Sequence, residues 1–307
     1  MANLTVLYSD TSWQAMGRIV GLTDDCVVAS FPASKTNQVL FVPKAGGESL
    51  KFDPFPGSSL TPVNAFGDYV VVQKATPRKP QTTFLLNKSG EVVALATGKL
   101  VSKPNVFASR IDEGGVYGDV RNSTQISNTS WNFDGEINLT SANMFIAGTF
   151  NGTPVSGNLV VDLPSNLGES QALLVSNGWV VGRAYEFEGG KVKKSTGTSV
   201  SWIWNGSGPA QLCLHPDGKK FSLVSVSPSG RFVAGLAWEN GTVGQEEVVI
   251  DLVNKRAMLL KDLAECGPGG GVDFASCRFD TDNSLYAKRM QNENGPFEIV
   301  KISNLDN

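Results

Sequence analysis

The chain has 307 residues, of which 26 are lysine or arginine and 29 are aspartate or glutamate, so its formal net charge is −3. This balance excludes a general electrostatic affinity for nucleic acid or anionic lipid, which requires a strongly basic surface. Hydrophobic residues make up 41% of the chain, enough for a packed core, and no apolar run approaches the ~20 residues of a membrane span.

The N-terminal segment is typical of a β-strand and not of a targeting signal. Residues 4–8 read Leu-Thr-Val-Leu-Tyr, and the first basic residue of the chain is Arg18. A secretory signal begins with a cationic region, and none is visible here. The sequence therefore predicts synthesis in the cytoplasm, with virion association as the destination considered below.

A short phrase recurs seven times along the chain: an apolar residue, a polar turn, then an apolar run that often ends in glycine. The copies cover residues 22–29, 63–72, 111–118, 139–148, 175–182, 226–235 and 279–287. Their mean spacing of ~43 residues is typical of a β-propeller, in which each repeat forms one four-stranded blade. We predict an all-β, seven-bladed β-propeller that forms a single domain over residues 1–307. The third and fourth copies begin only ~28 residues apart, which leaves six blades as the alternative.

The two ends of the chain predict how the last blade is completed. Only seven residues follow Val300, too few for a fourth strand, whereas residues 4–8 precede the first repeat without a blade of their own. We expect this N-terminal strand to pair with the strand at 297–302 and so cover its edge. The small residues that end the apolar runs predict that the inner strands of adjacent blades approach closely around the central axis.

The repeats resemble those of the broad group of propellers that includes WD-repeat, TolB-like and bacterial extracellular-repeat proteins. The Gly-His and Trp-Asp pairs of WD repeats are absent from this sequence. The resemblance therefore implies an architecture and not an activity. In its richness in Gly, Asn, Ser and Thr the chain also looks like structural propellers of bacteriophage tails, such as a tail hub or nozzle.

No set of residues predicts catalysis, a cofactor or a metal ion. The one histidine, His215, lies in a His-Pro-Asp-Gly sequence typical of a turn, and we expect its replacement by alanine to cost little stability. Residues 280–284 have the alternating oxygens of a calcium loop, but Leu285 stands where that loop needs glycine, which favours a hairpin turn. The four cysteines (26, 213, 266 and 277) lack metal-ligand spacing and predict reduced thiols.

Long connections predict the working face. In a propeller the loops between blades emerge at the same end as those between second and third strands, and binding residues concentrate on such loops. The predicted long-loop face holds a basic sector and three aromatic anchors: Lys191, Lys193, Lys194, Lys219, Lys220, Tyr185, Phe187 and Trp238. Glu186, Glu188 and Glu239 on the same face keep glycan binding or cleavage open. Arg231 marks the opposite, tight-turn face.

These features together predict a non-enzymatic protein, a scaffold that docks to other proteins within a larger assembly. A structural component of a virion, such as a phage tail, is the specific form of this hypothesis. The alternative is a propeller that binds or cleaves glycans through its long-loop face.

Overall fold

The computed structural model describes residues 2–10, 17–32, 37–76, 79–141, 146–157, 159, 161–188, 191–192, 199–239 and 244–306. Its strands form six antiparallel blades, so the chain is an all-β, six-bladed β-propeller. The blades divide between two compact units, which are described separately: an N-terminal unit (residues 7–154) and a C-terminal unit (residues 1–6 and 155–307). No helix in the described part of the chain is long and apolar enough to cross a membrane.

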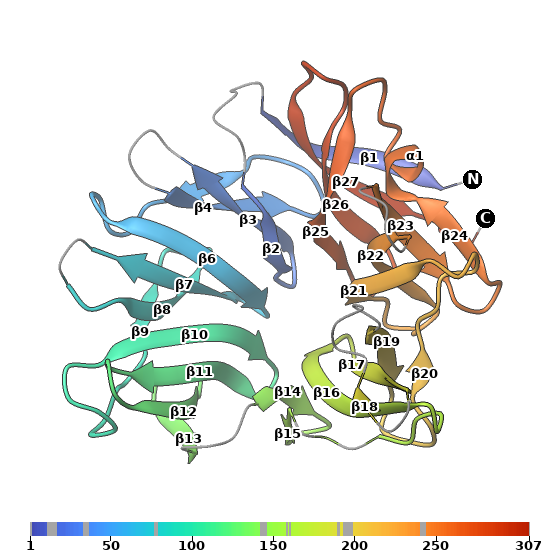
Figure 1. Cartoon of the computed structure of the whole chain (residues 1–307). Coiled ribbons are helices and arrows are strands. Elements are labelled where there is room, and N and C mark those ends of the chain that lie inside the picture. The colour runs from blue at the N-terminus through green and yellow to red at the C-terminus, as the bar shows by residue number, and fades with distance from the viewer. Residues whose placement is uncertain are drawn as a thin grey trace. The chain divides into compact units, whose positions relative to one another are not determined.

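The N-terminal unit holds three four-stranded blades (Figure 1). Blade 1 consists of β2 (Ile19–Leu22), β3 (Cys26–Pro32), β4 (Asn37–Pro43) and β5 (Leu50–Phe52). Blade 2 consists of β6 (Ser59–Phe66), β7 (Tyr69–Ala75), β8 (Thr82–Asn87) and β9 (Val92–Ala94). Blade 3 consists of β10 (Asn105–Asp112), β11 (Gly115–Arg121), β12 (Ile126–Trp131) and β13 (Ile137–Ser141).

The C-terminal unit holds the other three blades. Blade 4 consists of β16 (Leu167–Ser176), β17 (Trp179–Glu188), β19 (Ser199–Trp204) and β20 (Gln211–Leu212), and the short β18 (Lys191–Val192) also pairs with β17. Blade 5 consists of β21 (Lys220–Val226), β22 (Phe232–Trp238), β23 (Gln245–Asp251) and β24 (Arg256–Leu259). The single-turn helix α1 (Leu260–Leu263) follows it. Blade 6 consists of β25 (Gly271–Phe279), β26 (Leu285–Met290), β27 (Phe297–Ser303) and β1 (Asn3–Asp10).

The predicted number of seven blades is wrong, and the six-blade alternative is confirmed. Leu139, which begins the fourth repeat, lies in β13 and pairs with Ser130 as part of the outermost strand of blade 3. The last three residues of that repeat, 146–148, lie in β14 (Ile146–Phe150), which pairs with β15 (Thr153–Ser156) in a two-stranded ribbon. The ribbon is anchored to blade 3, because the carboxylate of Asp112 accepts a hydrogen bond from the backbone N–H of Thr149. The β14–β15 hairpin thus carries part of the repeat pattern that elsewhere marks the inner strands of a blade.

The predicted pairing of the N-terminal strand is confirmed. β1 lies beside β27 as the fourth strand of blade 6. Ala2 and Leu4 pack against the core cluster that contains Val300 and Ile302. Two segments almost 300 residues apart in sequence therefore share one sheet.

Each innermost strand has an irregularity in its pairing with the second strand of its blade. The register shifts occur between Ile19 and Gly21, Pro62 and Asn64, Ala108 and Arg110, Ala172 and Leu174, Leu223 and Ser225, and Asp273 and Arg278. A β-bulge bends a strand and increases its twist. The recurrence of this irregularity in all six described blades indicates that the blades are copies of one structural unit.

The bulges explain why glycine ends several of the apolar runs. Gly118, Gly182 and Gly235 lie directly opposite Ala108, Ala172 and Leu223, the last residues before each bulge. A Cβ atom at these glycines would collide with the carbonyl oxygen of Phe107, Gln171 or Ser222, respectively. Close approach was expected between the inner strands of adjacent blades, whereas at these three glycines it is to the bulged strand of the same blade.

Side-chain hydrogen bonds connect the tight turns of the C-terminal unit. Asn177, in the turn between β16 and β17, donates through Nδ2 to the carbonyl of Val226 at 2.8 Å and to that of Phe279 at 3.2 Å. One amide therefore bridges the inner strands of blades 5 and 6 from blade 4. Trp179 Nε1 adds a hydrogen bond of 3.0 Å to the carbonyl of Pro228. The tight-turn end of this unit is held by specific contacts.

We expect Asn177→Gly to lower the free energy of unfolding by about 1–3 kcal/mol, because two carbonyls lose their donor. Glycine adopts the left-handed backbone of this position, where φ is 51°, so backbone strain does not contribute. The matched control is Asn151→Gly, in the equivalent exposed Asn-Gly turn of the β14–β15 ribbon, where φ is 49°. Chemical denaturation measures both variants; an equal loss of stability would show that the bridge contributes nothing.

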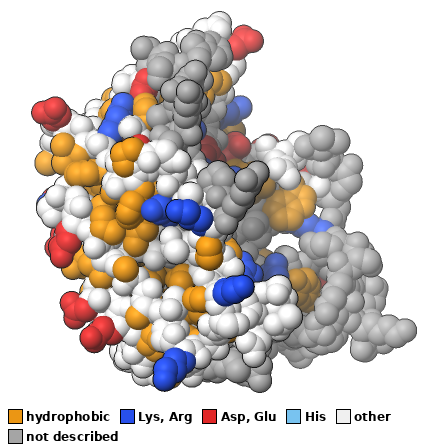
Figure 2. Space-filling view, turned by 90° about the vertical axis from the view of Figure 1, so that its left-hand side faces the viewer, with side chains coloured by type: hydrophobic (Ala, Val, Ile, Leu, Met, Phe, Trp, Pro, Cys, Tyr) orange, Lys and Arg blue, Asp and Glu red, His pale blue; other side chains and the backbone are white. Residues whose placement is uncertain are grey.

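Surface charge is dispersed on the side of the molecule shown in Figure 2. Basic and acidic side chains lie among polar and hydrophobic ones over the visible described residues, with several acidic ones along the left-hand margin of this view. This agrees with a net charge of −3.

Candidate functional site

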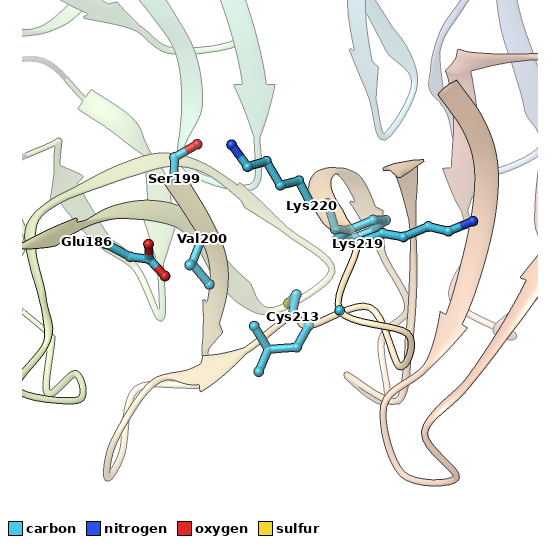
Figure 3. A pocket seen from close by; sticks show the side chains of 9 residues that line it. Glu186, Ser199, Val200, Cys213, Lys219 and Lys220 are labelled. Atoms are coloured by element: carbon cyan, nitrogen blue, oxygen red, sulfur yellow. The ribbon is translucent and has the colours of Figure 1, made fainter. Parts of the chain in front are cut away.

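A pocket of about 220 Å³ opens between blades 4 and 5, at the end of the C-terminal unit that carries the long loops (Figure 3). It is lined by Glu186, Ser199, Val200, Cys213, Leu214, Gly218, Lys219, Lys220 and Phe221. Blade 4 contributes the ends of β17 and β19, and blade 5 contributes the start of β21. The connector between the blades, residues 213–219, supplies the rest of the wall.

Ser201 joins the two blades beside this pocket. Its hydroxyl donates to the carbonyl of Phe221 at 3.2 Å and accepts from the backbone N–H of Leu223 at 3.3 Å. Its own carbonyl accepts from the N–H of Cys213 at 2.9 Å, which fixes the start of the connector. The pocket therefore rests on a hydrogen-bonded seam, so its wall is positioned before any ligand arrives.

The structure brings four of the predicted binding residues to this region. Lys219 and Lys220 line the pocket, and their side chains extend in opposite directions, with Lys220 reaching toward Ser199. Trp238 is half-buried and lies directly opposite Lys220 in the pairing of β21 with β22. Tyr185 precedes Glu186 in β17 and pairs with Ser199. We call these four residues and the pocket lining the docking patch.

The other predicted binding residues cannot be placed in the docking patch. The backbones of Phe187 and Lys191 lie in β17 and β18, where Phe187 pairs with Val192 and Glu188 pairs with Lys191. Their side chains, and all of Lys193 and Lys194, lie outside the described residues. The role of this part of the basic sector stays a prediction.

Leu214 is a site residue that the sequence analysis missed. Its side chain is 58% exposed at the pocket, next to the fully buried Cys213. The signal is visible in the sequence as an apolar residue inside a polar inter-blade turn, Leu-Cys-Leu-His-Pro-Asp-Gly. A single exposed apolar residue is ordinary on a protein surface, so Leu214 is of interest here because it lines the pocket.

Charge in the docking patch is partly neutralised. Lys219 Nζ lies 2.6 Å from a carboxylate oxygen of Glu246. This hydrogen bond lowers the pKa of Glu246 and raises that of Lys219, so both groups are charged near neutral pH. The predicted basic sector is therefore less basic at Lys219 than its sequence indicates.

The thiols of this chain are poor nucleophiles. All four cysteines are free, as predicted, and Cys213 in the pocket wall is fully buried. Burial raises the pKa of Cys213, and it also raises the pKa of Cys277 to about 12. Because the thiolate is the reactive form, the wall of the pocket offers no activated cysteine.

His215 forms the predicted turn, but its side chain is buried. Its carbonyl accepts a hydrogen bond of 3.0 Å from the N–H of Gly218, and its side chain is only 2% exposed. It is not among the residues that line the pocket. The burial revises the expectation that His215→Ala costs little stability, since the replacement removes a packed side chain.

The calcium-like segment after β25 is a hairpin turn, as predicted. Asp282 accepts a hydrogen bond of 2.9 Å from the N–H of Ser284, and its other oxygen lies 2.9 Å from Lys301 Nζ. Within the described ranges, no three His, Cys, Asp or Glu side chains are grouped closely enough to hold a metal ion. The carboxylates at this turn are used in local contacts.

We expect excess EDTA to leave the melting temperature unchanged, because Lys301 already neutralises Asp282 without a metal ion. Differential scanning calorimetry with and without the chelator measures this. A bound structural metal stabilises the folded state, so its removal would lower the melting temperature. Such a decrease would identify Asp280 and Asp282 as the first ligands to replace by asparagine.

No protein-family model matches the chain, and no curated protein sequence is significantly similar to it. Solved structures match its fold. An uncharacterized protein from Listeria monocytogenes is 11% identical; the match covers 93% of this chain and 94% of that one, with a TM-score of 0.51.

Two further matches have lower TM-scores. TolB from Acinetobacter baumannii is 9% identical with a TM-score of 0.44; the match covers 90% of this chain, which spans 63% of the TolB chain. An oligogalacturonate lyase from Vibrio parahaemolyticus is 8% identical with a TM-score of 0.42, over 98% of this chain and 96% of that one. At 11% identity the match to the Listeria protein shows a shared fold alone, and the sheet topology makes the fold of this chain a β-propeller.

Proposed function

We propose that this protein binds another protein through the docking patch and does not catalyse a reaction. The observation that carries the proposal is the size and lining of the pocket. Its 220 Å³ is below the ~300–1,000 Å³ of pockets that enclose small molecules, and is suited to a single inserted side chain. Leu214 and Trp238 supply apolar area beside Lys220, the mixture of apolar anchors and polar rim that protein interfaces use.

The test places a photo-crosslinking amino acid at Leu214 in the full chain, in cells that produce it. The matched control is Val253, which is 68% exposed and lies in the β23–β24 turn at the opposite end of blade 5. We expect one adduct of discrete mass from Leu214 and none from Val253. Equal labelling from both positions, or no adduct from either, would contradict the proposal.

Once mass spectrometry identifies the adduct, binding of the purified partner is measured by titration. We expect Lys220→Glu and Trp238→Ala each to weaken binding roughly tenfold, a cost of ~1.4 kcal/mol. Thermal melting of each variant distinguishes lost contacts from lost folding.

The control for charge is Lys255→Glu, at an exposed position in the β23–β24 turn. Arg231, which the sequence indicated as the control, is unsuitable, because its Nη2 lies 2.7 Å from the buried carboxylate of Asp251. Its Nη1 also pairs with Asp306. Charge reversal at Arg231 would leave Asp251 unpaired and destabilise the protein whatever its role in binding.

A structural role in a virion, such as a phage tail, is the more specific form of this proposal. Its support is compositional: many Gly, Asn, Ser and Thr residues with no evident catalytic set. Proteomics of purified particles tests it directly, with the chain expected at a fixed stoichiometry. Detection only in the unassembled fraction would contradict a role in the virion, and it would not contradict docking to another protein.

Glycan binding is the second candidate, favoured by the position of Glu186. Glu186 lines the pocket, and carboxylates are the groups that glycoside hydrolases use to cleave sugars. Glu239 is exposed at the end of β22, whereas the side chain of Glu188 lies outside the described residues. A glycan array with a hydrolysis assay separates the candidates, since docking to protein predicts neither binding nor cleavage.

A further inference from the structure

The connector between blades 4 and 5 depends on the side chain of His215. Residues 213–219 leave β20 and enter β21, and this segment supplies Leu214, Gly218 and Lys219 to the pocket. Any change in the turn at 215–218 therefore changes the pocket wall. Because the connector is short, an opening of this turn is expected to move the rest of the connector.

When its imidazole is neutral, His215 stabilises this turn by accepting a hydrogen bond. Nδ1 accepts a hydrogen bond of 3.2 Å from the backbone N–H of Asp217. An imidazole nitrogen that accepts carries no proton, so the proton of the neutral ring is on Nε2. Nε2 is buried without a hydrogen-bond partner among the described residues. Protonation of Nδ1 would remove the acceptor of the Asp217 N–H and place a charge in a site that is 5% exposed.

Three charged groups surround His215. Asp217 Oδ2, in the same turn, lies 4.0 Å from Nδ1 on a side chain that is largely exposed to water. Lys219, from the connector, and Glu246, from β23, form the ion pair described above. Burial is the largest influence and lowers the pKa of His215; the attraction of Asp217 and Glu246 opposes it, and the repulsion of Lys219 adds to it.

We propose that His215 is a pH-sensitive contact that keeps the turn at residues 215–218 closed. Mild acidification protonates its imidazole and opens this turn, which displaces Leu214 and Gly218 from the pocket wall. This pH sensitivity goes beyond the docking proposal, and only its consequence for a partner rests on that proposal.

The direction of the pH effect follows from linkage. An exposed histidine in the unfolded chain titrates near ~6.5, and the folded-state value lies below it. The unfolded or open form therefore binds more protons as the pH falls below ~6.5, and the closed turn loses stability there. Above this range the histidine is neutral in both forms and the turn stays closed.

The experiment uses the full chain by itself, so its outcome is independent of any partner. The chain has one histidine, so its imidazole signal in an NMR titration needs no assignment by mutation. Amide hydrogen exchange at Asp217 and Gly218, expressed as protection factors, is measured at pH 7.5 and 5.5. The methyl signals of Leu214 and Val200 report on the pocket.

The matched variant is His215→Asn. An asparagine side-chain oxygen accepts a hydrogen bond from the N–H two residues ahead, as His215 Nδ1 does, but it does not titrate. If this variant folds poorly, the wild-type titration and exchange data alone still decide the question. The unrelated turn at 280–284 provides internal amides whose protection is expected to be independent of His215.

We expect the imidazole to titrate below ~6.5, with protection at Asp217 and Gly218 falling at least ~10-fold at pH 5.5 in the wild type and unchanged in His215→Asn. The Leu214 methyl signals are expected to shift with the same midpoint. The wild type is also expected to lose ~2 °C or more of melting temperature relative to the variant over this range. A histidine that titrates normally, or that titrates without loss of protection at these two amides, would overturn the proposal.

Discussion

Deleting residues 1–9 is expected to lower the free energy of unfolding by roughly 5 kcal/mol or more, at the severe end of single lesions. The deletion removes most of β1 and leaves β27 with a free edge. It also uncovers the part of the core that Ala2 and Leu4 cover, against Val300 and Ile302. Urea denaturation measures the loss, and an exposed strand edge is expected to promote self-association, which gel filtration detects.

Two controls separate strand pairing from a general effect of truncation. A synthetic peptide of residues 1–10 added in trans should restore stability in a concentration-dependent manner, whereas a scrambled peptide should not. Within the intact chain, Leu4→Ala should cost more than Val6→Ala, because Leu4 packs against the core while Val6 is 45% exposed. Unchanged unfolding after the deletion would mean that β1 contributes no stability to blade 6.

The sequence predicts the class of this fold well, since the turn-and-strand phrase occurs once in each blade. It also predicts the partner of β1, because residues 4–8 have the pattern of a strand that belongs to none of the repeats. Blade number is harder to predict. Leu139 carries the same local pattern as the true inner strands, yet β13 is an outer strand, and only its pairing with β12 distinguishes the two. Local pattern defines a strand, whereas long-range pairing defines its position.

The candidate site, like the fold, was predictable from the sequence only in part. Loop length predicted the region that contains Lys219, Lys220, Tyr185 and Trp238. No sequence pattern indicated that Glu246, 27 positions after Lys219, would neutralise that lysine. Nor did any pattern show that the His-Pro-Asp-Gly turn would bury its imidazole instead of exposing it. Both depend on how the connector packs against blade 5, which is a tertiary property.

Gly235→Ala is expected to lower the free energy of unfolding by about 3 kcal/mol, although it adds a single methyl group. Gly235 lies in β22 opposite Leu223, just before the bulge in β21. Its new Cβ would collide with the backbone carbonyl oxygen of Ser222 and with the ring of Phe221. A backbone oxygen cannot rotate away as a flexible side chain can, so the inner strand itself has to move.

The matched control is Gly271→Ala, at the start of β25, where an added Cβ meets no atom within 4 Å and φ is not in the left-handed region. This replacement is expected to be neutral or to stabilise by up to ~1 kcal/mol, because alanine restricts the unfolded chain. Urea denaturation of both variants measures the difference. Gly118→Ala is expected to behave like Gly235→Ala, since it meets the carbonyl of Phe107 in the same relation to its bulge. If Gly235→Ala and Gly271→Ala were equally tolerated, the bulge would not be the reason that glycine ends these apolar runs, and their recurrence would need a different physical cause.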